Sequence, residues 1–96
     1  MLQIEVLDDA VVSLDSALVY PNPVVGRGTV KIRSLPPDAR VNIYSIAGRL
    51  IAEDLRPDAV FREVRWDIPD DMASGLYFAL IMTDQGEKVM PFAVVR

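Results

Sequence analysis

The chain has 96 residues, of which 51% are apolar, so it fits one folded domain with a modest core and is not a disordered segment. Ten basic and fourteen acidic side chains give a net charge of −4, which argues against nucleic acids and anionic membranes as partners, since both require a basic face. Cysteine and histidine are both absent, which excludes a disulfide scaffold, a thiolate nucleophile and a Cys/His zinc site.

Residues 1–16 are predicted to form a linker or an edge strand that belongs to an upstream region, with full membership of the fold as the alternative. Leu2 to Val6 alternates apolar and polar residues, as a strand does, and Asp8-Asp9 follows. The sequence contains no run of about 18 apolar residues and therefore predicts no membrane-spanning helix. The N-terminus also lacks the basic and apolar regions of a signal peptide. If the module is exported, we expect the leader to lie on a longer parent protein.

The stretch Tyr20-Pro21-Asn22-Pro23 marks the start of the domain proper, which we assign to residues 17–96. Proline lacks an N–H and fixes φ, so two prolines this close do not fit a central strand. Asn22 precedes a proline and is therefore biased towards an extended conformation. We predict a rigid structural connector that ends the linker and sets the direction of the first strand.

The rest of the chain is a series of short extended runs separated by turn residues. The predicted strands cover residues 28–34, 40–46, 49–55, 60–67, 75–82 and 87–95. In the 60–67 run we expect Val60, Val64 and Trp66 on one face. No segment of ten or more residues keeps a helical period. Counting the run before the connector, roughly seven strands predict an antiparallel β-sandwich, with a small barrel as the all-β alternative.

The last two runs carry the most distinctive patterns. Residues 75–82 are almost continuously apolar, which predicts a central strand with both faces covered. Residues 87–95 contain Pro91, which predicts an edge strand or a bulged one.

Four residues are assigned structural roles from their type and place. Gly48 supplies a positive φ for a tight reversal, and Gly75 allows a sharp turn into the central strand. Tyr77 lies early in that strand, where sandwich folds place a corner tyrosine whose hydroxyl holds a loop. Trp66 supplies a large apolar side chain between the sheets.

The sequence offers only weak candidates for a catalytic, metal or sugar-binding site. The aspartates at 67, 70, 71 and 84 could offer oxygen ligands to Ca²⁺, but their spacing is not that of an EF-hand and they fit strand-ending turns. A serine–lysine pair from Ser34 or Ser74 with Lys31 or Lys88 fits solvated strand faces better than a nucleophile. Tyr44 is the best candidate for an exposed sugar platform. We predict no catalytic, metal or cofactor site and no small-molecule substrate.

The ordered set of motifs resembles a known family. After the connector come Ile43-Tyr44 and Gly48-Arg49, then Trp66, then Ser74-Gly75-Leu76-Tyr77, and finally a closing strand with Lys88. This resembles the immunoglobulin-like C-terminal domains of exported bacterial proteins, including type IX secretion sorting domains and a module of the flagellar hook-capping protein. Ser45 stands where that family has aspartate, and the closing strand contains Pro91.

The resemblance implies an immunoglobulin-like sandwich that acts as a non-catalytic sorting signal and surface-attachment module of a larger exported protein. Its partners would be the outer-membrane secretion machinery or neighbouring domains, and its location extracellular or at the cell surface. The partner would read the closing strand, with Lys88, Val89, Met90 and Arg96 as contact residues, by strand addition at an exposed edge. Nucleic-acid binding and membrane insertion are not expected. The alternatives are a structural or adhesive spacer and a carbohydrate-binding accessory module.

Overall fold

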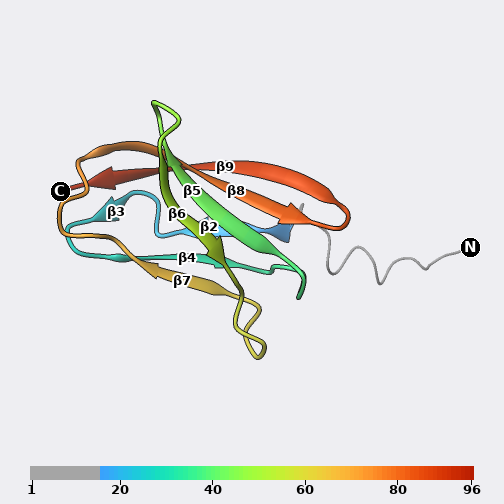
Figure 1. The fold of residues 1–96 in the computed structure, drawn as a ribbon. Coiled ribbons are helices and arrows are strands. Elements are labelled where there is room, and N and C mark those ends of the chain that lie inside the picture. Colours follow the sequence, from blue (N-terminus) through green and yellow to red (C-terminus); the bar gives the residue numbers. More distant parts are fainter. Residues whose placement is uncertain (1–15) are drawn as a thin grey trace, which may run out of the picture.

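The computed structural model describes residues 16–96, which form eight strands in two sheets (Figure 1). The strands are β2 (Leu18–Tyr20), β3 (Val24–Val25), β4 (Thr29–Arg33), β5 (Arg40–Ser45), β6 (Leu50–Leu55), β7 (Val64–Asp67), β8 (Gly75–Thr83) and β9 (Gly86–Val95). The predicted all-β sandwich is confirmed. The linker or edge strand predicted at 1–16 lies almost wholly outside the described residues. Within the described part, no helix is long and apolar enough to cross a membrane.

A three-stranded sheet in the order β2-β4-β7 faces a five-stranded sheet in the order β3-β9-β8-β5-β6. All neighbouring strands are antiparallel except β3, which pairs parallel to the end of β9. This two-residue strand was missed because it is too short to show any alternation. It raises the strand count above the predicted seven.

The core lies between the inner faces of the two sheets. Alternate residues of a strand point to the same face, so each strand contributes every second side chain. The buried aliphatic residues of the central strands are Val30 and Ile32 of β4, Val41 and Ile43 of β5, and Ala79 and Ile81 of β8. Burial of each large aliphatic side chain contributes about 1.5–3 kcal/mol.

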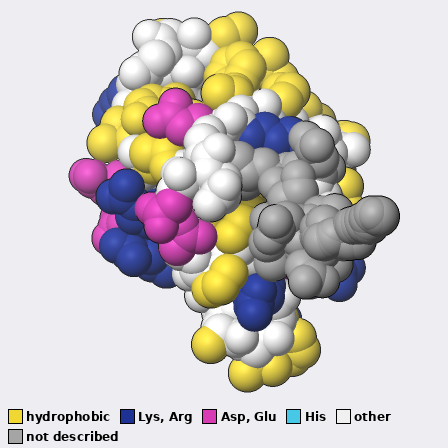
Figure 2. Space-filling model, turned by 90° about the vertical axis from the view of Figure 1, so that its right-hand side faces the viewer, with side chains coloured by type: hydrophobic (Ala, Val, Ile, Leu, Met, Phe, Trp, Pro, Cys, Tyr) yellow, Lys and Arg dark blue, Asp and Glu magenta, His cyan; other side chains and the backbone are white. Residues whose placement is uncertain are grey.

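Strand β8 lies between β5 and β9, so its predicted central position is confirmed. Its outer face, however, is only partly covered: Leu76 is exposed and Phe78 is half-buried. Figure 2 shows hydrophobic side chains gathered along the upper side of the molecule, which is the side of the five-stranded sheet in Figure 1. The apolar run therefore reflects one buried face and one apolar surface, and the prediction of two covered faces is wrong.

The strand predicted over residues 60–67 begins only at Val64. Val60 and Phe61 are 79% and 64% exposed in a turn that projects from the sandwich. The cause is Asp58, whose carboxylate accepts hydrogen bonds from the backbone N–H groups of Val60 (2.6 Å) and Phe61 (3.3 Å). An aspartate that bonds the backbone two residues on stabilises a turn and competes with strand pairing. The shared face predicted for Val60 and the residues of β7 is therefore wrong.

Candidate functional site

The closing strand β9 has one fully paired side and one partly unpaired side. It pairs with β8 residue for residue from Gly86 to Val94. On the other side, β3 pairs only with Val94 and Val95. Among residues 16–96, no strand pairs with this other side over residues 86–92. We call this stretch the open side of β9.

Pro91 lies on the open side of β9. The N–H of Ala93 points there, because it donates to the side-chain oxygen of Asn22 (3.0 Å). Residues two apart in a strand direct their backbone groups the same way, so the nitrogen of Pro91 and the N–H of Val89 also face the open side. Pro91 thus costs the β8 ladder no hydrogen bond. Within residues 16–96, the first half of β9 has no strand on its second side, as the edge prediction requires, whereas a bulge is wrong because pairing with β8 is unbroken.

The three contact residues predicted near the start of β9 lie on two different faces. Val89 is 58% exposed and presents both its side chain and its backbone. Lys88 and Met90 are half-buried, and Met90 packs against the core. Of the three, Val89 is the most accessible to a partner.

Arg96 joins the end of β9 to the turn before β8. Its guanidinium donates hydrogen bonds to the carbonyl oxygens of Pro69 (3.0 Å), Met72 (3.0 Å) and Asp70 (3.1 Å). Its backbone N–H donates to the hydroxyl of Ser74 (2.8 Å). Arginine has five donors in a fixed fork and can satisfy several carbonyls at once. The predicted contact residue thus holds a turn in place with the same donors a partner would need.

The connector of residues 20–23 runs from the three-stranded sheet to the five-stranded sheet. The peptide bonds before Pro21 and Pro23 are both cis. Between them, Asn22 accepts the N–H of Ala93, just before β3 starts to pair with β9. These contacts agree with the structural role expected of the connector.

Glu63 forms a polar network with Arg65 and Tyr20. The residue is only 6% exposed, and its carboxylate accepts hydrogen bonds from Arg65 Nε (2.7 Å) and the Tyr20 hydroxyl (2.8 Å). These bonds lower the pKa of the Glu63 carboxyl. The bond to Glu63 and burial raise the pKa of the Tyr20 hydroxyl. The network anchors the first residue of the connector to the segment just before β7.

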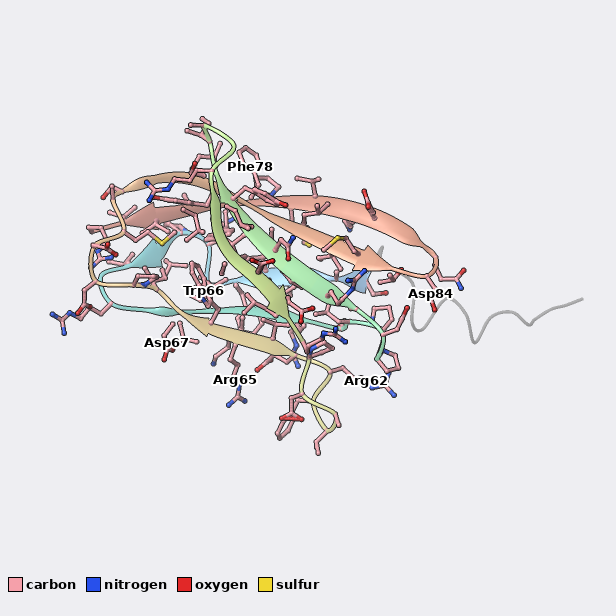
Figure 3. All side chains as sticks on the ribbon, viewed as in Figure 1. Arg62, Arg65, Trp66, Asp67, Phe78 and Asp84 are labelled. Carbon is pink, nitrogen blue, oxygen red and sulfur yellow. The ribbon has the colours of Figure 1, made fainter. Side chains whose placement is uncertain are left out.

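Trp66 is half-buried and packs against the core. Figure 3 shows its ring on the inner side of β7, towards the other sheet, with Arg65 and Asp67 on the outer side. The expected inward orientation is present, but the ring is not fully enclosed.

The corner tyrosine and the tight reversal are formed as expected. The Tyr77 hydroxyl donates to the carbonyl oxygen of Ala73 (2.7 Å), four residues upstream. Gly48 has a φ of 86°, a conformation that favours glycine. Gly75 is the first residue of β8.

The aspartates considered for Ca²⁺ do not converge. Asp67 accepts a hydrogen bond from Thr29 (2.6 Å), and Asp70 pairs with Arg27 at 3.6 Å. Figure 3 places Asp67 and Asp84 towards opposite ends of the molecule. Among residues 16–96, no group of three or more acidic, His or Cys side chains is arranged to hold a metal ion.

Tyr44 is half-buried, and its hydroxyl accepts a hydrogen bond from the Asn42 amide (3.3 Å). Its ring therefore does not stand free on the surface as a sugar platform would.

A groove of about 490 Å³ lies between the tip of the β5–β6 hairpin and the turn before β8. Ile51, Met72 and Tyr77 provide apolar lining, and Arg49 and Asp71 provide charges. Sequence reasoning missed this groove. Both the Gly48-Arg49 and the Ser74–Tyr77 motifs belong to the ordered set that carries the family resemblance, although nothing in their spacing shows that they meet in space.

The chain is similar to a known protein family and to a solved structure. Residues 18–95 match the family model described as secretion system C-terminal sorting domain. The structure is similar, with a TM-score of 0.73 and 31% identity, to PorZ, an essential bacterial surface component of the type IX secretion system of Porphyromonas gingivalis. The match covers 86% of this chain but only 12% of PorZ. No curated protein sequence matches the chain significantly. The chain belongs to the family of secretion system C-terminal sorting domains.

Proposed function

We propose that this domain is the export signal of a larger protein, and that the type IX secretion machinery recognises it through the open side of β9. The family match over residues 18–95 and the similarity to a component of that secretion system support the proposal. The observation that carries the mechanism is the incomplete pairing of β9 among the described residues. The parent protein would then reside outside the cell or at its surface.

The open side of β9 suits strand addition. The N–H and C=O groups of Glu87 and Val89 and the C=O of Pro91 face it, by the same alternation that directs Ala93 to Asn22. Asn22 and β3 occupy the remainder of that side. An incoming strand therefore has a defined place to begin and to end. Backbone pairing would supply affinity, and contact with the exposed Val89 side chain would add selectivity.

The other predicted contact residues take supporting roles in this proposal. Lys88 and Met90 lie on the face opposite to Val89, and Met90 packs against the core. Arg96 fixes the far end of the strand through the 69–72 carbonyl oxygens. Such a domain works by recognition of a folded surface, with no reaction on its own side chains.

The decisive variant is Val89→Pro in a fusion of this domain to a reporter, expressed in a bacterium with type IX secretion. Proline at residue 89 removes a donor on the open side without removing a hydrogen bond to β8, as Pro91 already does. We expect the intact fusion to reach the medium or cell surface. We expect Val89→Pro to reduce this by about tenfold, the equivalent of 1.4 kcal/mol of binding. The matched control is Val89→Thr, which keeps the N–H and a β-branched side chain.

Two outcomes would contradict the proposal. If the intact fusion stays in the periplasm of a competent host, the domain is not an export signal and acts as a spacer. If Val89→Pro is exported as well as Val89→Thr, the machinery does not read the open side of β9. The variant Lys88→Glu then tests whether charge at the start of β9 is read instead.

A further inference from the structure

Arg49 belongs to the Gly48-Arg49 motif, but the fold gives its side chain no structural role. Gly48 shapes the hairpin turn and Tyr77 holds the residue 73 carbonyl, so both have reasons within the fold. The side chain of Arg49 is exposed and makes no hydrogen bond or ion pair within residues 16–96. An exposed cation with no internal partner is available to bind another molecule.

The backbone on the Arg49 side of the groove is fixed. Ser45 accepts the N–H of Gly48 (2.9 Å) on its carbonyl oxygen and donates its own N–H to the carbonyl oxygen of Arg49 (2.9 Å). The Ser45 hydroxyl oxygen also accepts the N–H of Arg49 (3.2 Å). These bonds set the direction in which the Arg49 side chain leaves the hairpin.

The opposite wall of the groove is also held by hydrogen bonds. Arg96 fixes the carbonyl oxygens of Pro69 and Met72, and Tyr77 fixes that of Ala73. Two walls that are ordered before binding reduce the entropy cost of capturing a ligand. Hydrogen bonds within the domain therefore hold both walls of the groove.

The lining of the groove defines what it can bind. Met72 and Tyr77 offer apolar surface inside. Arg49 offers a planar fork that suits a carboxylate. Asp71, on the same groove, repels a second carboxylate and so favours one orientation.

We propose that the groove binds an extended segment of a partner protein in which an acidic residue adjoins a large aliphatic or aromatic residue. The carboxylate pairs with Arg49, and the apolar side chain enters the groove beside Met72 and Tyr77. Assignment of that partner to the secretion machinery rests on the proposed function. The groove is built from the β5–β6 hairpin and the turn before β8, so it is distinct from the open side of β9.

The test is a titration of the ¹⁵N-labelled 96-residue chain with two peptides, followed by NMR. The probes are acetyl-Ser-Leu-Glu-Phe-amide and its charge-reversed counterpart acetyl-Ser-Leu-Lys-Phe-amide. We expect the acidic peptide to shift resonances of residues 45–51 and 69–77, and the basic peptide to bind at least about tenfold more weakly. Arg49→Glu should weaken the acidic peptide about tenfold, and Arg49→Lys should weaken it less. Arg40→Glu, the same charge change at the other end of β5, should leave binding unaltered.

The proposal is overturned if the acidic peptide shifts other residues, if both peptides bind equally, or if Arg49→Glu binds as the parent does. Absence of binding at about 5 mM peptide also overturns it. So does concentration-dependent shifting of the same residues without peptide, since the occupant would then be a second copy of the chain. Export of the intact reporter fusion is measured separately. If the fusion is exported but no peptide binds, the groove proposal fails and the export-signal proposal is supported. If the acidic peptide binds but the fusion is not exported, the export-signal proposal fails and peptide binding by the groove is supported.

Discussion

The side-chain oxygen of Asn22 accepts a hydrogen bond from the backbone N–H of Ala93 at 3.0 Å, across a sequence separation of 71 residues. This contact links the connector to the closing strand just where β3 begins to pair. It occupies a donor that would otherwise lie on the open side of β9. The asparagine between the two prolines thus sets the limit of the strand surface available to a partner.

Asn22→Ala should lower the free energy of unfolding by about 0.5–1.5 kcal/mol, the usual net contribution of one hydrogen bond. The loss should fall at the lower end, because water can reach this exposed site. Urea denaturation monitored by Trp66 fluorescence measures it. Asn22→Asp keeps an oxygen acceptor and should lose less. Equal losses in the two variants would show that the acceptor is not what matters.

Tyr77→Phe should lower the free energy of unfolding by about 1 kcal/mol or slightly more. The ring remains in the core beside Phe92, with ring centres 6.0 Å apart, while the bond to the Ala73 carbonyl is lost. Thermal denaturation of Tyr77→Phe against the parent chain measures the change. Tyr44→Phe is the matched control, since its hydroxyl makes only a long bond of 3.3 Å on the outer face. Equal shifts in the two variants would count against a corner role for Tyr77.

Most of the paired strands could be predicted from the sequence because they follow local patterns of apolar and polar residues. Val30 and Ile32 alternate with Lys31 and Arg33, and that alternation alone places one face inside. The failures occur where side chains bond the backbone. Asp58 converts the start of a predicted strand into a turn, and nothing in its apolar neighbours signals this.

The candidate site was accessible only in part, because its geometry depends on distant contacts. Pro91 signalled the side of the closing strand on which, among residues 16–96, no strand pairs ahead of β3. Arg96 was predicted to face a partner, but its donors bond carbonyl oxygens 24 to 27 residues away. The groove beside Arg49 likewise brings together two motifs that are separate in sequence. Periodicity cannot report contacts of this range.

Stability should fall at acid pH through Glu63. Hydrogen bonds from Arg65 and Tyr20 lower its pKa in the folded chain. A depressed carboxyl pKa stabilises the fold above the unfolded value of about 4.3, and this contribution is lost as pH falls through the folded value. The melting temperature of the parent should therefore drop below about pH 4.3 more steeply than that of Glu63→Gln. If the melting temperatures of the two proteins fall equally with decreasing pH, Glu63 has no role in the loss of stability at acid pH.

Tyr20 should act at the other end of the pH scale. Its pKa is raised, first by the hydrogen bond to Glu63 and then by burial, so its contribution is present below the unfolded value of about 10. That contribution is lost as pH rises through the folded value. Tyr20→Phe should lack this alkaline loss of melting temperature. If the melting temperature of Tyr20→Phe falls at alkaline pH as much as that of the parent, Tyr20 is not the group responsible.

Gly28→Ala should destabilise the fold by about 1–3 kcal/mol, as overpacking does. A Cβ at residue 28 would lie 2.5 Å from Cγ1 of Val24, which is fully buried. The added methyl must therefore displace a core side chain. Chemical denaturation of Gly28→Ala, Val24→Ala and the double variant forms a thermodynamic cycle. The double variant should be more stable than the sum of the single losses predicts, and strict additivity would argue against the clash.

Proline substitutions at neighbouring residues of β9 should differ sharply in their effect on stability. Val89→Pro removes an N–H from the open side, so the free energy of unfolding should change by about 1 kcal/mol or less. Met90→Pro removes an N–H that faces β8, where Met90 pairs with Ala79, and leaves an acceptor without its partner. That loss should cost about 2 kcal/mol or more. Urea denaturation of both variants measures the difference. Similar losses in the two would mean that the alternation inferred from the Ala93 bond does not extend along β9, and the open side would then have to be reassigned.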